Sequence, residues 1–420
     1  MSRFDQAANR RRFLRYLAAS SLVAYGGGSR LAQALEAPDR LPDPMEWAPR
    51  DLDHLITNPR AAINVFDFEP VMKANVLPGH FGYMASGIDD DATLRANREG
   101  FQKFKLRPRR LVDVSKIDMS VELFGQKYPS PIVVAPTGGH RAYYPEGEIA
   151  TAKGAKAGDH LMILSTQTST AIEDVADARG RPIWYQLYAT NKFEVAKAHV
   201  ERAEKAGCIA VAVTVDATGG RNQEVLFRLA RADPHPCQSC HETPTGPSAR
   251  EGMSGPMYKD VDTSGLANIA ATALTWDYLK RIRDATKMKC VIKGILSAED
   301  AKMAADAGYD GIIVSNHGGR NSDAVGSTIE ALPDIISATG GRTTVLIDSG
   351  FRRGTDIVKA LAMGASGVAV GRPYLWGLGA FGEPGVERVL ELLRTELASA
   401  MGQVGAPGIK DLVPAMVKHV

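Results

Sequence analysis

The strongest constraint on the fold of this 420-residue chain is a repeated alternation of short apolar segments with alanine-rich segments after residue 130. The apolar segments are hydrophobic throughout and rich in β-branched residues, which is typical of parallel strands buried on both faces. The segments between them, such as 192–207 and 297–308, have helical spacing. Eight strands are therefore expected, at residues 131–139, 161–166, 183–188, 210–217, 290–295, 311–319, 344–350 and 367–373.

Eight strands that are each followed by a helix can close on themselves, so the predicted fold class is α/β, a (β/α)8 TIM barrel. An open doubly wound sheet is the alternative. The barrel is expected to cover residues 131–420, with residues 35–130 as an N-terminal extension that packs on it. The connection after the fourth strand is unusually long, which predicts a loop insertion over residues 218–275 on the active-site face.

The first 34 residues predict an export signal. They contain six Arg and one Asp, consecutive arginines before Phe13, a mild apolar stretch, and the small-residue pattern AQA at 32–34. This pattern resembles a twin-arginine signal peptide; a basic amphipathic helix that stays on the protein is the alternative. The apolar stretch is too short to span a bilayer, so no stable membrane anchor is expected. The mature protein is therefore expected in the periplasm.

The rest of the chain has an ordinary globular composition, with 44% hydrophobic and 23% charged residues in the whole sequence. The formal net charge is +2, and the first 34 residues contribute +5 of it, which leaves about −3 for the remainder. This balance does not favour a nucleic acid partner. Two of the four cysteines, Cys208 and Cys290, lie beside apolar runs and are expected in the core.

Polar and charged side chains follow six of the eight predicted strands, at the end where such a barrel carries its chemistry. In VSNHGGRNSD (314–323), a histidine suits proton abstraction near neutral pH, and an arginine three residues later can bind a carboxylate. The whole set of strand-end residues is Tyr188, Asp216, Lys293, His317 with Arg320, Asp348 with Arg352, and Arg372.

The motifs after the last two strands predict a phosphate site. IDSGFRRGTD (347–356) and VAVGRP (368–373) combine loop N–H groups, a helix N-terminus and arginines. A bound mononucleotide phosphate is the first interpretation, and a bare anion site is the alternative.

With these motifs the sequence resembles the FMN-dependent α-hydroxy acid dehydrogenases and oxidases, which include glycolate oxidase, mandelate dehydrogenase and flavin-dependent L-lactate dehydrogenase. The resemblance extends from about residue 50 to the C-terminus. It implies FMN as cofactor, a 2-hydroxy acid as substrate, a cytochrome or quinone as electron acceptor, and a homo-oligomer, commonly a tetramer. The motifs that carry it are YMASG, RPRRLVDVSKIDM, APTGG, QLY, TVD, VIKG, SNHGGR, DSGFRRGTD and GRP.

The resemblance implies which residues react with and bind the substrate. His317 would take a proton from the substrate as two electrons pass to the flavin, and Asp216 would orient His317 and stabilise its charged form. Tyr188 would hydrogen-bond the substrate near its hydroxyl group. Arg320 and Tyr83 would hold the substrate carboxylate.

The resemblance also implies the flavin site. Lys293 would stabilise negative charge at the pyrimidine edge of the reduced flavin. The other residues would contact the ring, the ribityl chain or the phosphate. They are Ser165, Gln186 and Thr214 by hydrogen bonds to the ring, Thr137 and Gly138 through the backbone, Asp348 on the ribityl chain, Arg352 and Arg372 on the phosphate, and Gly350 and Gly371 in the same two terminal motifs.

Two departures from the family pattern affect the predicted function. The second carboxylate-binding arginine of the family falls at Gln223, so Arg221 or Arg228 would replace it, or one arginine would hold the substrate. Gly138 stands where oxidases of the family tend to have alanine, which favours electron transfer to a carrier rather than to oxygen.

The sequence therefore predicts FMN-dependent oxidation of a small, lactate-like L-2-hydroxy acid to the 2-oxo acid, with electrons passed to a carrier. An oxidase that uses oxygen is one alternative. A non-catalytic haem or redox-binding module on the same barrel is the other.

The insertion contains CQSCH (237–241), which has the C-x-x-C-H spacing of a c-type haem attachment site. Covalent haem c on Cys237 and Cys240, with His241 as axial ligand, is the first interpretation. A Cys237–Cys240 disulfide, a small metal site that also uses His235, and an inert loop remain open. No other metal site is predicted.

Overall fold

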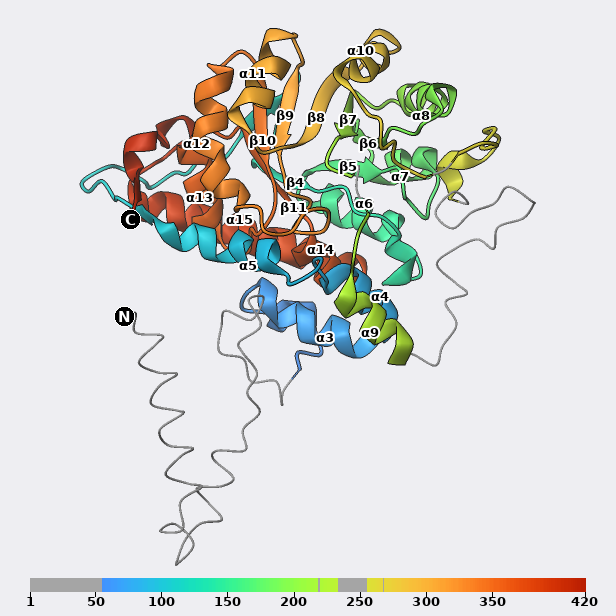
Figure 1. The fold of residues 1–420 in the computed structure, drawn as a ribbon. Helices are drawn as coiled ribbons and strands as arrows, with labels where there is room; N and C mark the ends of the chain where they lie inside the picture. The colour runs from blue at the N-terminus through green and yellow to red at the C-terminus, as the bar shows by residue number, and fades with distance from the viewer. Residues whose placement is uncertain (1–54, 218–219, 233–254, 267) are drawn as a thin grey trace, which may run out of the picture. The chain divides into compact units, whose positions relative to one another are not determined.

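The computed structural model describes residues 55–217, 220–232, 255–266 and 268–420, all within the unit that runs from Ala48 to Val420. These residues form a closed barrel of parallel strands in the order β10-β11-β4-β5-β6-β7-β8-β9 (Figure 1). Because β11 pairs with β4, the predicted (β/α)8 barrel is confirmed and the open sheet is wrong. The strands are β4 (Ile132–Val134), β5 (Leu161–Ser165), β6 (Trp184–Tyr188), β7 (Ala210–Thr214), β8 (Lys289–Ile295), β9 (Gly311–Val314), β10 (Thr344–Ile347) and β11 (Gly367–Val370).

Several strands end earlier than the sequence predicted, because the polar motif residues leave the sheet. β9 ends at Val314, and His317 lies in the following turn with a φ of +59°. Ser349, which follows β10, has a φ of +77°. Such conformations are uncommon for residues with a side chain and concentrate at functional sites.

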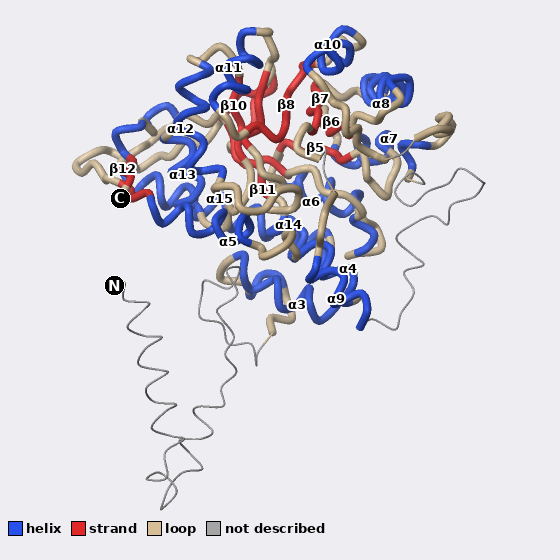
Figure 2. Tube along the Cα trace, viewed as in Figure 1, coloured by secondary structure: helices blue, strands red, loops and turns tan. Residues whose placement is uncertain are grey.

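Helices surround the barrel on its outside (Figure 2). In α8, the buried side chains Val195, Ala196, His199, Val200 and Ala203 recur at helical spacing and form the face that packs on the barrel. The helices that follow the strands are α6 (Glu148–Ala157), α7 (Ile172–Arg179), α8 (Phe193–Lys205), α10 (Trp276–Asp284), α11 (Ala298–Asp306), α12 (Thr328–Thr339), α13 (Gly354–Ala362), α14 (Arg372–Phe381) and α15 (Glu383–Val404).

The segment before the barrel packs on it through helices and two small sheets. Three helices, α3 (Phe68–Asn75), α4 (Pro78–Ala85) and α5 (Ala92–Glu99), precede β1 (Phe104–Leu106), which pairs with β12 (Val417–His419). The hairpin of β2 (Val121–Leu123) and β3 (Gln126–Tyr128) follows. Short 3-10 turns occur at Pro59–Ala61, Val65–Asp67, Gly100–Lys103, His140–Ala142, Pro256–Tyr258, Ile409–Asp411 and Pro414–Met416.

The core fills the barrel and is closed at its amino end by the hairpin. Phe124 stacks on Trp184, the first residue of β6, with ring centroids 4.9 Å apart. Inward side chains such as Val133, Ile163 and Ala212 are fully buried around them. Since this end of the barrel is packed, a ligand can enter only from the carboxyl ends of the strands.

The insertion after β7 contains a helix that the sequence reasoning missed, α9 (Glu224–Ala232), which packs against α4 (Figure 1). Its sequence, EVLFRLARA, places Leu226 and Leu229 three residues apart, a helical signal within a segment otherwise interpreted as loop.

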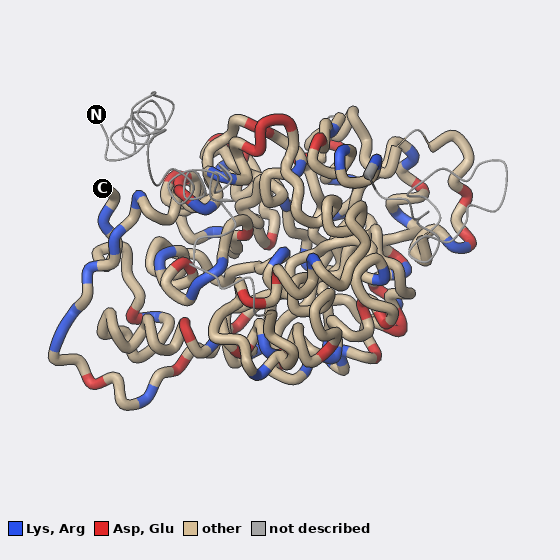
Figure 3. The backbone as a smooth tube through the Cα atoms, turned by 90° about the horizontal axis from the view of Figure 1, so that it is seen from below, with Lys and Arg blue, Asp and Glu red and all other residues tan. Residues whose placement is uncertain are grey.

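Three further observations concern the described residues. Cys208 and Cys290 are buried, as expected. Basic and acidic residues are interspersed along the described chain (Figure 3). Within the described ranges, no helix is both long enough and apolar enough to cross a bilayer.

Candidate active site

A cavity of about 1070 Å³ lies at the carboxyl ends of the barrel strands. Most of the predicted site residues line it, although they come from distant parts of the sequence. Asp216, Gln186 and Thr214 do not reach the cavity and lie directly behind its wall. The predicted residues that line it are Tyr83, Thr137, Gly138, Ser165, Tyr188, Lys293, His317, Arg320, Asp348, Gly350, Arg352, Gly371 and Arg372.

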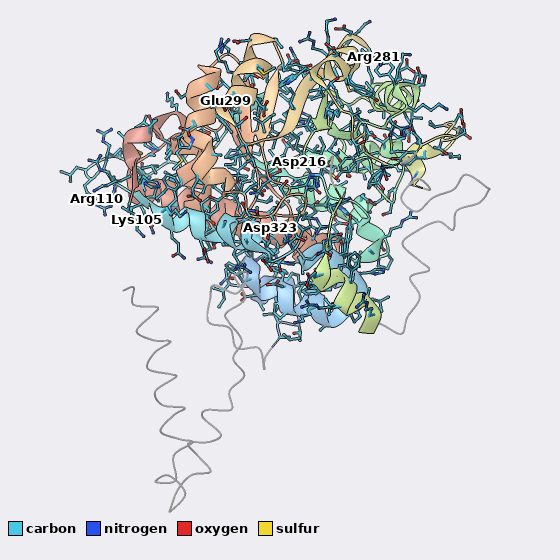
Figure 4. All side chains as sticks on the ribbon, in the orientation of Figure 1. Lys105, Arg110, Asp216, Arg281, Glu299 and Asp323 are labelled. Carbon is cyan, nitrogen blue, oxygen red and sulfur yellow. The ribbon has the colours of Figure 1, made fainter. Side chains whose placement is uncertain are left out.

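The centre of the site is a histidine–carboxylate pair. His317 Nδ1 lies 3.0 Å from Asp216 Oδ1. Asp216 follows the carboxyl end of β7 and is largely buried; Figure 4 labels it near the middle of the view, whereas Arg110 and Arg281 lie near the edges. Although burial opposes ionisation of Asp216, the interaction with His317 and the charge of Lys293 hold the pKa of this carboxyl below its usual value. Asp216 is therefore a carboxylate at neutral pH.

His317 is suited to accept a proton. Burial and the positive charge of Lys293 lower the pKa of His317, and the Asp216 carboxylate only partly offsets them. The imidazole is therefore neutral at neutral pH. With hydrogen on Nδ1 facing Asp216, the Nε2 lone pair points to the other side.

Tyr188, the last residue of β6, occupies that other side. Its hydroxyl lies 3.0 Å from His317 Nε2. Burial raises the pKa of Tyr188, an effect that the charge of Arg221 partly offsets. The phenol therefore stays protonated and donates to Nε2, which agrees with the tautomer that Asp216 selects.

An irregularity in β8 makes room for the carboxylate. The register of β8 against β9 shifts between Lys293 and Ile295, and Gly294 between them has a φ of +114°. A Cβ atom on Gly294 would lie 2.8 Å from Cβ of Asp216. Glycine at this position allows the strand to pass beside Asp216.

The two predicted carboxylate-binding residues contact each other. The Arg320 guanidinium lies 4.7 Å from the centroid of the Tyr83 ring and donates hydrogen bonds to the carbonyls of Tyr83 and Ser86. Arg320 is thereby tied to the end of α4. Both side chains line the cavity, as the resemblance implied.

Gln223 is not placed to bind substrate. It is 7% exposed, and its amide donates to Ser86 Oγ at 3.4 Å. Its side chain therefore belongs to the packing between α9 and the end of α4.

Arg221 shares the cavity lining with Arg320. Its side chain lines the cavity and acts electrostatically on Tyr188. Arg228, the other alternative, is exposed on α9 and pairs with Glu224. Of the residues considered for the second arginine, only Arg221 faces the site.

A hydrogen-bond network joins the ends of β8, β9 and β10. Lys293 Nζ donates to Ser315 Oγ at 3.0 Å and lies 3.6 Å from Asp348 Oδ2. Ser315 Oγ in turn donates to Asp348 Oδ2 at 2.9 Å and accepts from the backbone N–H of His317 at 3.0 Å. Lys293 and His317 are thus held by one shared set of bonds.

Two buried arginines form a concentrated positive region in the cavity wall. Burial and the charge of Arg320 lower the pKa of Arg372 to about 9. Burial and neighbouring guanidinium groups, including Arg372, also lower the pKa of Arg352, which stacks on the Trp376 ring. Arg372 begins α14, and α13 begins at Gly354. A phosphate dianion would relieve the repulsion between these arginines and accept hydrogen bonds from their guanidinium groups.

The opposite kind of surface, neutral and polar, lies at the ends of β5, β6 and β7. Ser165 Oγ donates to Gln186 Oε1 at 3.0 Å, and Gln186 Nε2 donates to Thr214 Oγ1 at 2.8 Å. Only Ser165 of the three reaches the cavity. In this arrangement Gln186 orients its neighbours, whereas the resemblance placed all three on the flavin ring.

Thr137 and Gly138 form the adjoining wall after β4. Thr137 Oγ1 lies 2.7 Å from His140 Nε2. A Cβ atom on Gly138 would lie 2.8 Å from Cβ of Gln167. The close packing of Gln167 is therefore sufficient to explain glycine at this position.

The residues present fit FMN. The cavity combines a buried cationic wall for a phosphate, a lysine for a ring edge that gains negative charge, and a backbone-lined wall at Gly138 and Gly371. A Cβ atom on Gly371 would lie 3.8 Å from Thr137 Cγ2 and 4.0 Å from Ala135 Cβ, and it would narrow the cavity beside this wall.

Two features of the site were missed by sequence reasoning. Asn321, four residues after His317, contacts both His317 and Asp216. The side chains of Leu226, Phe227 and Ala230 on α9 line the cavity. Cys237, Cys240 and His241 lie outside the described residues.

Sequence comparison gives a consistent result. The sequence pattern of the FMN-dependent dehydrogenase family matches residues 72–419. A peroxisomal (S)-2-hydroxyacid oxidase of Arabidopsis thaliana is 38% identical over 352 residues, which cover 83% of this chain and 94% of the relative. An L-lactate oxidase of Lysinibacillus sphaericus is 37% identical over 349 residues, covering 82% of this chain and 90% of the relative.

The solved structures agree. A mandelate oxidase structure superposes with a TM-score of 0.75 at 33% sequence identity, covering 85% of this chain and 98% of that one. Mandelate oxidase in complex with benzoyl-formic acid gives the same TM-score and coverage.

Proposed function

Because this chain belongs to the FMN-dependent dehydrogenase family, we propose that it oxidises a small L-2-hydroxy acid with an apolar side chain to the 2-oxo acid. Bound FMN accepts the two electrons that this oxidation releases. The observation that carries the proposal is the position of His317 Nε2, 3.0 Å from the Tyr188 hydroxyl, with Nδ1 held by Asp216.

The protein's own residues would bind and deprotonate the substrate. Arg320 and Arg221 would hold the carboxylate, since both cations face the cavity. The substrate hydroxyl would enter beside Tyr188, and His317 Nε2 would take a proton from the reacting carbon or oxygen. Asp216 would stabilise the imidazolium that results.

The apolar side chain of the substrate would face α9. Leu226, Phe227 and Ala230 give the cavity an apolar wall. An apolar wall favours an aliphatic or aromatic substituent and rejects a charged one by desolvation.

Anaerobic titration tests the proposal. Purified protein should show flavin absorption that bleaches with one or more L-2-hydroxy acids from a panel of increasing side-chain length. The matching D-acids and the amides of the same L-acids should leave the spectrum unchanged, because the amides lack the carboxylate. Failure of every L-acid to bleach the flavin would refute the function.

The electron acceptor is proposed from the sequence. Gly138 supports a carrier, but the packing of Gln167 offers a local reason for this glycine. The names of the relatives support oxygen instead, since they are oxidases. Measuring the rates of hydrogen peroxide formation and of dye reduction side by side would distinguish the two acceptors. A carrier enzyme should reduce the dye at least tenfold faster than oxygen.

The export signal and the haem site are also proposed from the sequence alone. Export predicts a mature protein that begins after Ala34 and is found in the periplasm, and conservative replacement of Arg11 and Arg12 by lysine should retain it in the cytoplasm. Haem c predicts a Soret band that survives acid denaturation and disappears when Cys237 and Cys240 are replaced by serine. The family match accounts for FMN and gives no support to haem.

A further inference from the structure

Asn321 makes contacts at the reactive pair that no role assigned so far explains. Its Nδ2 atom donates to Asp216 Oδ1 at 3.2 Å and lies 2.7 Å from His317 Nδ1. Two N–H groups, from His317 and Asn321, therefore converge on one carboxylate oxygen. The other oxygen, Asp216 Oδ2, is buried and has no hydrogen-bond partner among the described residues.

This arrangement has two electrostatic consequences with the same sign. A second donor on Oδ1 takes up part of the negative charge that would otherwise stabilise a charged imidazole. Because Nδ1 already carries a proton that faces Asp216, the amide N–H at 2.7 Å is a second donor against it, a contact that opposes positive charge on the ring. Both effects weaken the hold of His317 on a second proton.

We propose that Asn321 is a positioning residue that fixes Asp216 against His317 and lowers the proton affinity of His317. The side chain reaches both partners because it begins one turn after His317, in the loop that Gly318 and Gly319 fold back with positive φ values. Its catalytic consequence rests on the proposed function, whereas its effect on the proton affinity does not.

Other charged and titratable groups also act on His317. Lys293 from β8, Arg320 from the same loop and the Tyr188 hydroxyl from β6 are held by contacts that do not involve Asn321, whereas Asp216 loses one of its two donors when Asn321 is changed. A shift in the titration of His317 on substitution of Asn321 therefore reports the amide itself.

Nitrogen NMR of the oxidised holoprotein labelled in histidine tests the proposal directly. The His317 signals are assigned by their loss in His317→Asn. In Asn321→Ala, the titration midpoint of His317 should rise by about one pH unit, the equivalent of one hydrogen bond to a charged group. Asn321→Asp, which keeps the shape, should raise it further, because a second carboxylate faces Nδ1. Ser322→Ala, a change in the same loop outside these contacts, should leave the midpoint unchanged.

The reaction provides a second readout. In each Asn321 variant, the acidic limb of the anaerobic flavin-reduction rate should move to higher pH by the amount that the NMR midpoint of His317 moves in that variant. The proposal would be overturned if the His317 midpoint in both variants stayed within about 0.2 pH units of wild type, roughly one fifth of the expected shift. A fall in rate would not rescue it, because lost packing alone would slow the reaction without moving the titration. If no hydroxy acid reduces the wild type, the proposed function fails, and the NMR titration still decides the role of Asn321.

Discussion

The cavity is built by two regions that differ in how they hold their side chains. One is the strand-end network, Lys293, Ser315, His317 and Asp348 with Asp216, in which residues from adjacent barrel strands share buried hydrogen bonds. The other is the inserted wall, residues 221–230, where Arg221 and Phe227 enter the cavity from a segment outside the barrel. The first region holds its reactive atoms at fixed distances, whereas the side chains of the second can be substituted without leaving a buried charge unpaired.

This difference predicts that the first region affects the rate of reaction and the second affects which substrates bind. In the strand-end network a displaced side chain leaves a buried charge without its partner, which is costly. In the inserted wall, Phe227 is 46% exposed, and a change there mainly alters what the cavity accepts. Substitutions in the first region should therefore reduce the rate with every substrate, and those in the second should discriminate among substrates.

The largest effect is expected in the strand-end network. His317→Ala should lower the rate of anaerobic flavin reduction by on the order of 10³-fold, because no other base reaches the same position. The flavin should remain bound, since His317 is not part of the cationic wall. Stopped-flow absorbance measures the rate, and reduction at the wild-type rate would show that another group is the base.

A smaller effect is expected for the cation of the inserted wall. Arg221→Leu should lower kcat/KM about 10- to 100-fold, the range for one hydrogen bond to a charged group, mostly through a higher KM. Arg228→Leu, on the same segment but paired with Glu224 at the surface, should stay within about twofold. Equal losses in both variants would mean that Arg221 does not contact the substrate.

The pH dependence of stability tests a third place, where a later part of the insertion packs on α8. His199 on α8 packs edge-on against Tyr258 of the insertion, with ring centroids 4.7 Å apart. Burial lowers the pKa of His199 to about 4, from an ordinary value of 6.5. The unfolded chain therefore binds the proton first, and stability is lost as pH falls from 6.5 toward 4.

His199→Phe removes this contribution. Between pH 7 and pH 5 the wild type should lose about 2 kcal/mol more unfolding free energy than this variant, by denaturant titration at each pH. Identical losses in the two proteins would show that His199 is not protonated on unfolding.

The smallest effect is expected from the apolar side chain of the inserted wall. Phe227→Ala should change the ratio of kcat/KM between a long and a short L-2-hydroxy acid by about threefold to tenfold, with the short acid less affected. Met303→Ala on α11, at a similar 47% exposure, is the control and should leave the ratio unchanged. A uniform loss for all acids would place Phe227 in the reaction rather than in selection.

The sequence located the strand-end residues because each one directly follows a strand. Eight apolar runs identify the barrel, and parallel strands necessarily bring their carboxyl ends to one face. His317, Arg320 and Lys293 could thus be assigned to one site before any coordinates were known. The pairing of β11 with β4 closes the barrel, as the count of eight strands predicted.

The sequence could not place the residues whose roles depend on a neighbour far along the chain. Spacing left Arg221, Arg228 and a single-arginine site open, and in the structure Arg221 lines the cavity whereas Arg228 pairs with Glu224. The sequence did not indicate a role for Asn321, because its partner Asp216 lies 105 positions earlier.

The sequence by itself therefore determined the barrel, its reactive face and the chemistry of that face, since hydrophobic period and strand order are local properties of the chain. Only the tertiary structure shows which of the candidate cations lines the cavity and which amide contacts the histidine–carboxylate pair. Those outcomes depend on distances of a few ångströms between distant segments, and close packing across the molecule sets such distances.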